Sequence, residues 1–299
     1  MYYVRQLKPR SVQMLRKYVR LLASVGLGAL LSLGLPSPAL AQAYLGTNLL
    51  PFAVLGATPS VTCTESAGPA VITGDIGVTP AASITGFPAP CTNASGTLHL
   101  NDQAAIDAKA NLVTAYGVLD AQSCGSTIGP NLNGLTLTQG VYCVGAAATN
   151  LSGTLTLNAQ GNANASWTFK MSSSLITSPG STVSFSNPPA GGENACAVQW
   201  LVGSSATLDT TTTFVGNILA LTSITMNAGA NLTGRALARN GAVTMDSNTI
   251  SFAACGAGGG GAGVPTLSEW AMIALSLLLA LAGAVAMRSR GSQTGPRSV

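Results

Sequence analysis

The stretch that decides the fold is residues 197–250. It divides into three segments of 18 residues: AVQWLVGSSATLDTTTTF (197–214), VGNILALTSITMNAGANL (215–232) and TGRALARNGAVTMDSNTI (233–250). An earlier segment aligns at an offset of 31, with Phe169 matching Trp200 and Val183 matching Phe214. A period of this length, built of short strands and turns, is typical of a β-solenoid. An ordinary β-sandwich is the alternative, and three apolar columns that stay in register argue against it.

Two of the columns predict faces that are apolar inside and hydroxyl-rich outside, because side chains alternate along a strand. In the first face, Ala206, Ile224 and Val243 point inward. Its outward residues include Ser205, Thr207, Ser223, Thr225 and Thr244. In the second face, Phe214 and Leu232 point inward. Its outward residues are Thr182, Ser184, Thr213, Val215, Asn231, Thr233, Thr249 and Ser251.

The third face is apolar almost continuously, in segments 199–202, 217–220 and 235–238. A strand that is apolar on both sides is covered on both sides. Residues 102–122 are the cover we expect, since they form the one convincing helix between the two ends of the chain. Asn101 or Asp102 can cap this helix. Two apolar rows share its helical spacing: Ile106, Ala110 and Val113, and Leu112, Tyr116 and Leu119.

The composition excludes several classes of function. Only 7% of the 299 residues are charged, and the chain contains a single histidine, His99. Residues 42–258 carry four cations against eight anions, so their net charge is −4 and a nucleic-acid partner is not expected. We predict no catalytic residues, no metal and no cofactor.

Both ends of the chain predict export. Residues 1–41 are a signal peptide: a basic start, an apolar run from Leu21 to Leu35 and small residues before a cut after Ala41. Residues 42–255 form the solenoid domain, residues 256–263 a glycine-rich linker, and residues 264–299 a sorting signal. Within that signal, about 270–287 are apolar and end before Arg288, which predicts a transmembrane helix with a cytoplasmic end.

The tail also resembles the IPTL-type C-terminal sorting signal of Gram-negative bacteria. The motif residues are Pro265, Thr266, Leu267, Ser268, Glu269 and Trp270, with Val264 in place of the usual Ile. The resemblance implies recognition by an exosortase-like membrane protease. It implies a protein at the outer face of the cytoplasmic membrane, and then at the cell surface or outside the cell.

All six cysteines lie between the two targeting segments. An even number in an exported region predicts disulfides, and nearest-neighbour pairing gives Cys63–Cys91, Cys124–Cys143 and Cys196–Cys255. Free buried thiols are the alternative. The last bond would close the end of the solenoid, because Cys196 and Cys255 flank its last coils.

Several further motifs resemble the microbial ice-binding β-solenoid family. They include VITGDIGV (71–78), LTLTQGVY (135–142) and GRALARNGAV (234–243), and the similarity runs from about 43 to 254. The resemblance implies a right-handed, irregular β-helix of triangular section with one long α-helix packed alongside. It also implies that the partner is an ice crystal surface, bound through one flat face.

The second face is the ice-binding face that we expect. Some family members carry a T-[AG]-x-[TN] pattern, which segments 179–182, 210–213 and 228–231 match in part. Strands about 4.7–4.9 Å apart set a rigid repeat close to a spacing in ice. Thr offers a methyl and a hydroxyl in few rotamers, which can order water between them. The first face is the alternative.

Two other classes of function stay open. A surface adhesin or matrix protein would suit the tail equally well. A polysaccharide-acting enzyme is the third, since Asp209, Asn227 and Asp246 stack in one turn column and offer oxygen ligands for Ca²⁺. A ladder of hydrogen-bonded turns is the interpretation of this column that we favour.

Overall fold

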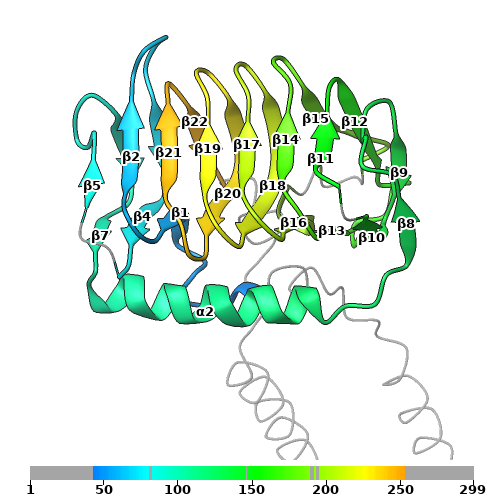
Figure 1. Ribbon diagram of the computed structural model, residues 1–299, viewed down its shortest axis with the longest axis horizontal. Helices are drawn as coiled ribbons and strands as arrows, with labels where there is room; N and C mark the ends of the chain where they lie inside the picture. The colour runs from blue at the N-terminus through cyan, green and yellow to red at the C-terminus, as the bar shows by residue number, and fades with distance from the viewer. Residues whose placement is uncertain (1–42, 81–82, 146, 189–191, 193–194, 253–299) are drawn as a thin grey trace, which may run out of the picture. The chain divides into compact units, whose positions relative to one another are not determined.

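Parallel strands wind through the part of the chain that the computed structural model describes, which is residues 43–252 without 81–82, 146, 189–191 and 193–194 (Figure 1). Every ladder between its named strands is parallel. The fold is mainly β with one long helix, α2 (Gln103–Asp120), and two short 3-10 turns, η2 (Ala43–Leu45) and η3 (Ala195–Ala197). The strands fall into three runs, which match the three predicted faces.

The first face is a run of seven strands. In spatial order they are β11 (Thr149–Leu151), β14 (Leu175–Thr177), β17 (Ala206–Leu208), β19 (Ile224–Met226), β21 (Val243–Asp246), β2 (Val61–Thr64) and β5 (Ile84–Thr85). The predicted inward residues Ala206, Ile224 and Val243 are fully buried and lie in register.

The second face contains β9 (Thr136–Thr138), β12 (Thr154–Asn158), β15 (Thr182–Ser186), β18 (Thr213–Ala220), β20 (Asn231–Ala238), β22 (Thr249–Ser251), β3 (Val71–Thr73) and β6 (Thr92–Ser95). The predicted alignment of Phe214 with Leu232 and Ile250 is the register observed, and all three side chains are buried.

The third run is the helix-covered face. It contains β8 (Ser126–Ile128), β10 (Gly140–Val144), β13 (Trp167–Met171), β16 (Val198–Val202), the second halves of β18 and β20, β1 (Phe52–Gly56), β4 (Asp75–Val78) and β7 (Leu98–Leu100). β18 and β20 pass from the second face into this face at Gly216 and Gly234. A Cβ on Gly234, whose φ is +153°, would lie 1.9 Å from the carbonyl oxygen of Gly216, so glycine is required at this corner.

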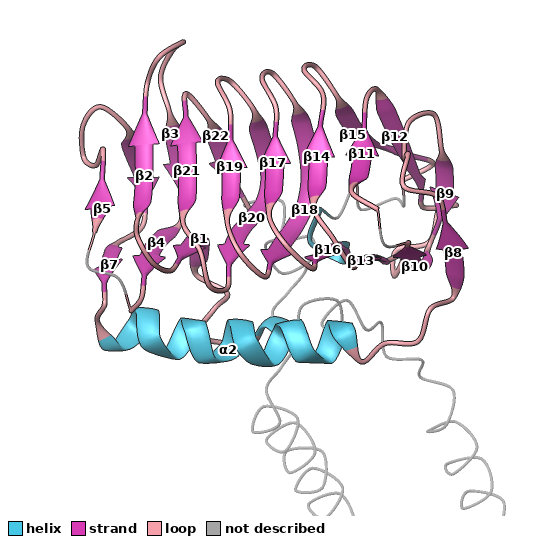
Figure 2. Cartoon of the chain, in the orientation of Figure 1, coloured by secondary structure: helices cyan, strands magenta, loops and turns pink. Residues whose placement is uncertain are grey.

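Helix α2 lies along this face from β7 at one end to β13, and β10 and β8 extend beyond it (Figure 2). It begins where predicted, and Asp102 caps it by accepting a 2.9 Å hydrogen bond from the Ala105 N–H. Leu112, Tyr116 and Leu119 are buried in a cluster that also contains Leu201, Leu219 and Leu237 from successive strands. The other apolar row points away, and Ile106 and Val113 are 44% and 39% exposed.

The first coils of the chain lie beyond its last coil, which the repeat does not indicate. β1 pairs with β20, β2 with β21 and β3 with β22. The expectation that the last repeats form the end of the solenoid is therefore wrong, because residues 52–100 continue the stack. A bond from Cys196 to Cys255 would not close its end, and Cys255 lies outside the described residues.

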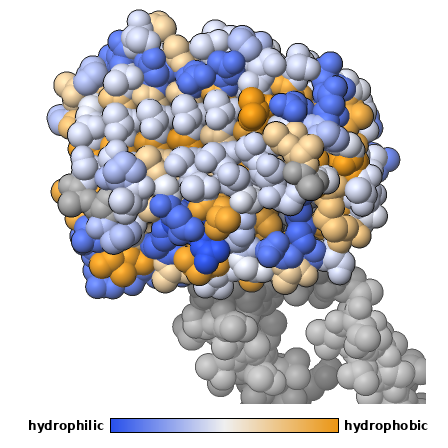
Figure 3. All heavy atoms as spheres, in the orientation of Figure 1, coloured by the Kyte–Doolittle hydropathy of each residue, from blue (hydrophilic) through white to orange (hydrophobic). Residues whose placement is uncertain are grey.

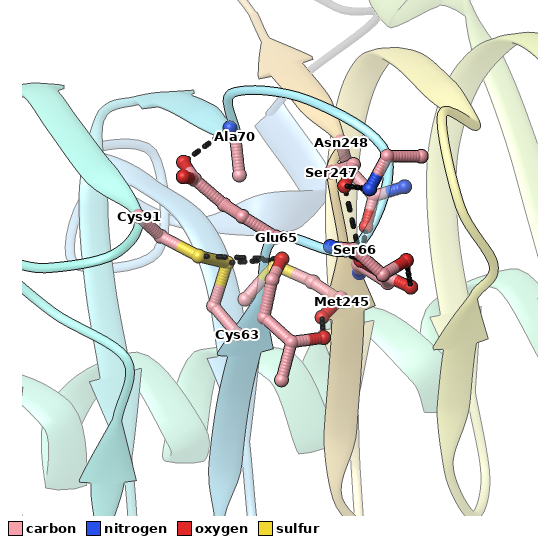
Figure 4. The surroundings of a disulfide bond; sticks show 11 residues. Cys63, Glu65, Ser66, Ala70, Cys91, Met245, Ser247 and Asn248 are labelled. Carbon is pink, nitrogen blue, oxygen red and sulfur yellow. Dashed lines mark hydrogen bonds between the residues drawn. A yellow bond between two sulfur atoms is a disulfide. The ribbon is translucent and has the colours of Figure 1, made fainter.

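Hydrogen bonds hold this junction together (Figure 4). The Ser66 N–H and hydroxyl both donate to the Asp246 carboxylate, and the Ala67 N–H donates to Ser247 Oγ at 2.9 Å. The disulfide between Cys63 and Cys91, as predicted, ties β2 to the next coil. The predicted Cys124–Cys143 bond is also present, and none of the cysteines in the described residues is free.

A buried polar column fixes the N-terminal segment to the helix-covered face. Gln199, Asn217 and Arg235 are in register there, and each is less than 5% exposed. The Tyr44 hydroxyl donates to Gln199 Oε1 at 2.6 Å, and Arg235 donates to Asn217 Oδ1 at 3.2 Å and to the Leu50 carbonyl at 2.8 Å. Burial lowers the pKa of Arg235 to about 10. These residues occupy positions that the sequence analysis counted as part of an apolar strand.

Candidate functional site

The second face carries two rows of outward side chains, which we call the first and the second rank. The first rank is in register across neighbouring strands and consists of Thr154, Thr182, Thr213, Asn231, Thr249, Val71 and Thr92. The second rank lies further along the same strands and consists of Thr136, Thr156, Ser184, Val215, Thr233, Ser251, Thr73 and Ser95. Because strands are about 4.7–4.9 Å apart, each rank repeats with that spacing.

Exposure differs between the two ranks. In the first rank Thr213, Asn231 and Thr249 are exposed, and Thr182 is half-buried. In the second rank Ser184, Thr233 and Ser251 are all half-buried. Val215 departs from the expectation: it is 9% exposed and belongs to the core cluster, because the second rank lies against the corner where the chain turns at Gly216. The first rank is therefore the part of this face that a flat partner would meet.

Both ends of the second face lie outside the residues predicted for it. The predicted residues are on β15, β18, β20 and β22, whereas the ranks continue onto β12 and β9 at one end and onto β3 and β6 at the other. These coils depart from the 18-residue period, so no alignment to the repeat could find them. The alternation in TLTLN (154–158) and VIT (71–73) was the available signal.

The first face, the alternative site, is also longer than predicted. Thr207, Thr225 and Thr244 are in register, and Thr62 and Thr85 extend the row across β2 and β5. Ser205 and Ser223 lie beside it and are half-buried, as are Thr207 and Thr225. Figure 3 shows this face as parallel rows of residues of intermediate hydropathy. Ile176, 40% exposed, follows Thr207 in the row and interrupts its hydroxyl character.

The four threonines at 210–213, which form the turn between the two faces, differ in role. Thr212 is fully buried, and its hydroxyl lies 2.8 Å from that of Thr177, which accepts from the Asp209 N–H at 2.7 Å. Thr213 is exposed in the first rank. Thr211 is exposed with a φ of +56°, and a β-branched residue in this region costs of order 1–3 kcal/mol.

Within the Asp209, Asn227 and Asp246 column, a side-chain hydrogen bond joins Asn227 to Asp209, whereas the Asp246 carboxylate accepts from Ser66. Asn227 donates to Asp209 Oδ1 at 3.0 Å, and this bond with that from the Thr210 N–H holds the pKa of Asp209 below its usual value. The Ser66 hydroxyl and then its N–H lower the pKa of Asp246 in the same way. The described residues contain no group of acidic, histidine and cysteine side chains suited to a metal ion. The bond between Asn227 and Asp209 agrees with the ladder of turns that we favoured, whereas the Asp246 side chain takes no part in it.

His99 and Lys170, two other polar side chains, lie at the two ends of α2 and interact with groups there. His99 Nδ1 lies 2.8 Å from Asp102 Oδ2, beside the helix cap. A cavity of about 280 Å³ near the end of α2 has Asp120 as the one carboxylate in its lining. Lys170, which also lines it, donates 2.6 Å hydrogen bonds to the carbonyls of Asp120 and Gln122, so its amine caps the helix end.

No helix among the described residues is long and apolar enough to cross a membrane. The span expected at about 270–287, the signal peptide, the linker and the sorting motif all lie outside the described residues.

Comparison with known proteins gives one consistent result. Residues 57–251 match the ice-binding-like family, and residues 262–289 match the IPTL-CTERM motif. An ice-binding protein from Nostoc sp. (strain HG1) is 43% identical over 240 residues, which cover 80% of this chain and 83% of that protein.

Solved structures agree. An ice-binding protein from an Antarctic biological consortium is 43% identical with a TM-score of 0.63, over 69% of this chain and 89% of that one. The ice-binding protein of the Antarctic ascomycete Antarctomyces psychrotrophicus is 36% identical with a TM-score of 0.60, over 69% and 96%.

Proposed function

The chain belongs to the ice-binding-like family, and from that membership we propose that it adsorbs to ice through the second face. The contact residues are those of the first rank, centred on Thr182, Thr213, Asn231 and Thr249. The residues of the second rank, including Ser184, Thr233 and Ser251, support the hydration layer that the first rank contacts. Val215 fills the corner at Gly216.

One observation carries this proposal: small polar side chains stand in register and exposed along successive strands of a rigid sheet. The β-branched Thr side chain keeps its methyl and hydroxyl in few orientations. The methyl groups favour ordered water between neighbouring strands, while the hydroxyls and the Asn231 amide hydrogen-bond to it. Water that is held at the spacing of the strands can join a growing crystal without rearrangement.

Exposure supports this choice of face over the first face. Three of the four central residues of the first rank are exposed, whereas of the three central threonines on the first face only Thr244 is exposed, and Thr207 and Thr225 are half-buried. A half-buried hydroxyl presents less of itself to a flat crystal. Ile176 also shortens the hydroxyl row of the first face, while the first rank has only Val71 as an aliphatic member.

The finer features of the fold and its attachment belong to the same proposal. The three strand runs support a β-helix of triangular section, and membership in the family supports its right-handed winding. The C-terminal sorting motif supports export and surface association. On this proposal residues 1–41 direct export, an exosortase-like protease recognises the 265–270 motif, and residues 270–287 hold the chain at the outer face of the cytoplasmic membrane in a Gram-negative bacterium.

A surface protein that binds no ice is the second candidate, and the sorting motif is the observation that favours it. Surface attachment by itself does not exclude ice binding, since a tethered ice-binding domain would hold a cell against ice. Ice shaping by the purified protein separates them.

The test compares the same change on the two faces. Thr213→Tyr places a bulky ring in the first rank, on a strand that tolerates aromatic residues, so stability should change by less than about 1 kcal/mol. Ice shaping and thermal hysteresis should fall sharply. Thr225→Tyr, the matched change on the first face, should leave both nearly intact.

Three outcomes would count against the proposal. If Thr225→Tyr abolishes shaping and Thr213→Tyr does not, the first face is the binding face. If wild-type protein shapes no ice, the surface role without ice binding is correct. If both variants lose their fold by circular dichroism, the premise that these strands accept aromatic residues is wrong.

A further inference from the structure

Thr211 occupies a backbone position that its neighbours fill with glycine. Hydrogen bonds between consecutive turns set the alignment: the Gly180 N–H donates to the Thr210 carbonyl at 2.9 Å, and the Thr211 N–H to the Ala228 carbonyl at 3.1 Å. The φ values are +70° at Gly180, +56° at Thr211 and +71° at Gly229. A residue without a Cβ adopts this conformation freely, whereas a β-branched residue does so under strain.

The fold gives no reason for a threonine there. Ser247, the next residue in the same column with a φ of +55°, is 7% exposed, accepts from the Ala67 N–H and donates to Asp246. Its side chain therefore joins two coils. The Thr211 side chain is exposed, and its hydroxyl donates to the carbonyl of the preceding residue, Thr210, at 2.7 Å. That bond links Thr211 to no other coil.

The position of Thr211 relative to the second face suggests what the side chain does. It precedes Thr213 by two residues, and both are exposed while Thr212 between them is buried. A Cβ built at Gly180 would lie 3.9 Å from Thr211 Oγ1, and one at Gly229 would lie 3.8 Å from Thr211 Cγ2. The side chain thus lies over the bare backbone of both neighbouring turns, with its hydroxyl toward one and its methyl toward the other.

We propose that Thr211 extends the ice-contact surface from the first rank of the second face onto the row of turns beside it. This inference rests on the proposed function, and it assigns the strained residue to binding rather than to folding. Strained backbone persists where the surrounding structure holds it, and it concentrates at functional sites. Thr211 repeats the chemistry of Thr213, a methyl with a hydroxyl, one step further toward the edge of the face.

The experiment separates binding from stability with Thr211→Gly, measured in protein purified after export. Glycine accepts the same φ, so the melting temperature should stay at the wild-type value or rise. Adsorption to ice, followed by fluorescence of labelled protein on a growing crystal, should weaken at least about fourfold, because the change removes one methyl group that contact with ice had buried, together with the hydroxyl. Thermal hysteresis at a fixed concentration should fall with it.

Gln160→Gly is the matched control. Gln160 also has a positive φ, +52°, and is exposed. Its turn follows β12, whereas the turn that contains Thr211 precedes β18, so Gln160 does not lie in the row of turns beside the first rank. This variant should keep wild-type ice adsorption.

Unchanged adsorption in Thr211→Gly, with Thr213→Tyr inactive, would overturn this inference and leave the proposed function intact. A lower melting temperature in Thr211→Gly would assign the side chain to folding and would also overturn it. If wild-type protein does not adsorb to ice, both proposals fail together.

Discussion

Leu112→Ala should destabilise the protein strongly, because Leu112 lies at the centre of the contact between α2 and the helix-covered face. The side chain is 0% exposed and packs in one cluster with Leu201, Leu219 and Leu237. Leu→Ala in a core costs about 2–5 kcal/mol, from lost transfer free energy and from the cavity left behind. The strands beneath Leu112 are fixed by ladders on both sides, so the cavity cannot collapse and we expect about 3–4 kcal/mol.

For a domain of this size, each kcal/mol lowers the melting temperature by about 2–4 °C, so the fall should be about 10 °C. Circular dichroism during heating, with urea unfolding for the free energy, measures both. Val113→Ala is the matched control on the adjacent residue, which is 39% exposed. It should cost less than about 1 kcal/mol. A larger loss of stability in Val113→Ala than in Leu112→Ala would refute the orientation of the helix. Loss of ice shaping in either variant, well below its melting temperature, would refute the conclusion that the helix lies apart from the binding face.

Replacing Cys63 and Cys91 together with Ser opens a bond that joins residues 28 positions apart, which should lower stability by about 3.5 kcal/mol by the chain-entropy relation. Calorimetry that finds equal stability for wild-type and double variant would contradict this. Asp246 has a folded-state pKa below its usual value, so its contribution to stability is present above the unfolded pKa near about 4 and is lost as the pH falls through the lowered pKa. The free energy of unfolding should therefore fall more steeply with acid in wild-type protein than in Asp246→Asn, and parallel profiles would show that the Ser66 contacts do not stabilise the charge.

The repeat predicted the register of the central coils because three apolar columns have to meet inside one core. Phe169 beside Trp200, and Ile224 between Ala206 and Val243, follow from that requirement alone. The covered third face followed from strands that are apolar on both sides. The cap at Asp102 was one of two adjacent candidates, since both Asn101 and Asp102 can accept from a helix N-terminus.

Other features could not be derived from periodicity. The rows Ile106–Ala110–Val113 and Leu112–Tyr116–Leu119 have the same spacing, and only contact with Leu219 and its neighbours decides that the second row is buried. The position of the first coils beyond the last coil depends on pairings between residues about 180 apart, which no local pattern encodes. For the same reason Thr62, Thr85, Val71 and Thr92 were absent from the predicted faces.

That pairing has a mechanical consequence. β22, the last strand of the described chain, lies between β20 and β3 rather than at the end of the stack. If ice holds the domain by its second face and the tail holds it to a cell, the pulling force would reach β22 and, through the predicted Cys196–Cys255 bond, Cys196. In a simple solenoid the last coil would peel away one ladder at a time, because it has a neighbour on one side only. If the domain is anchored in this way, the loaded strand would have to shear from β20 and β3 at once, and the coils of residues 52–100, which include β3, would help it to withstand tension.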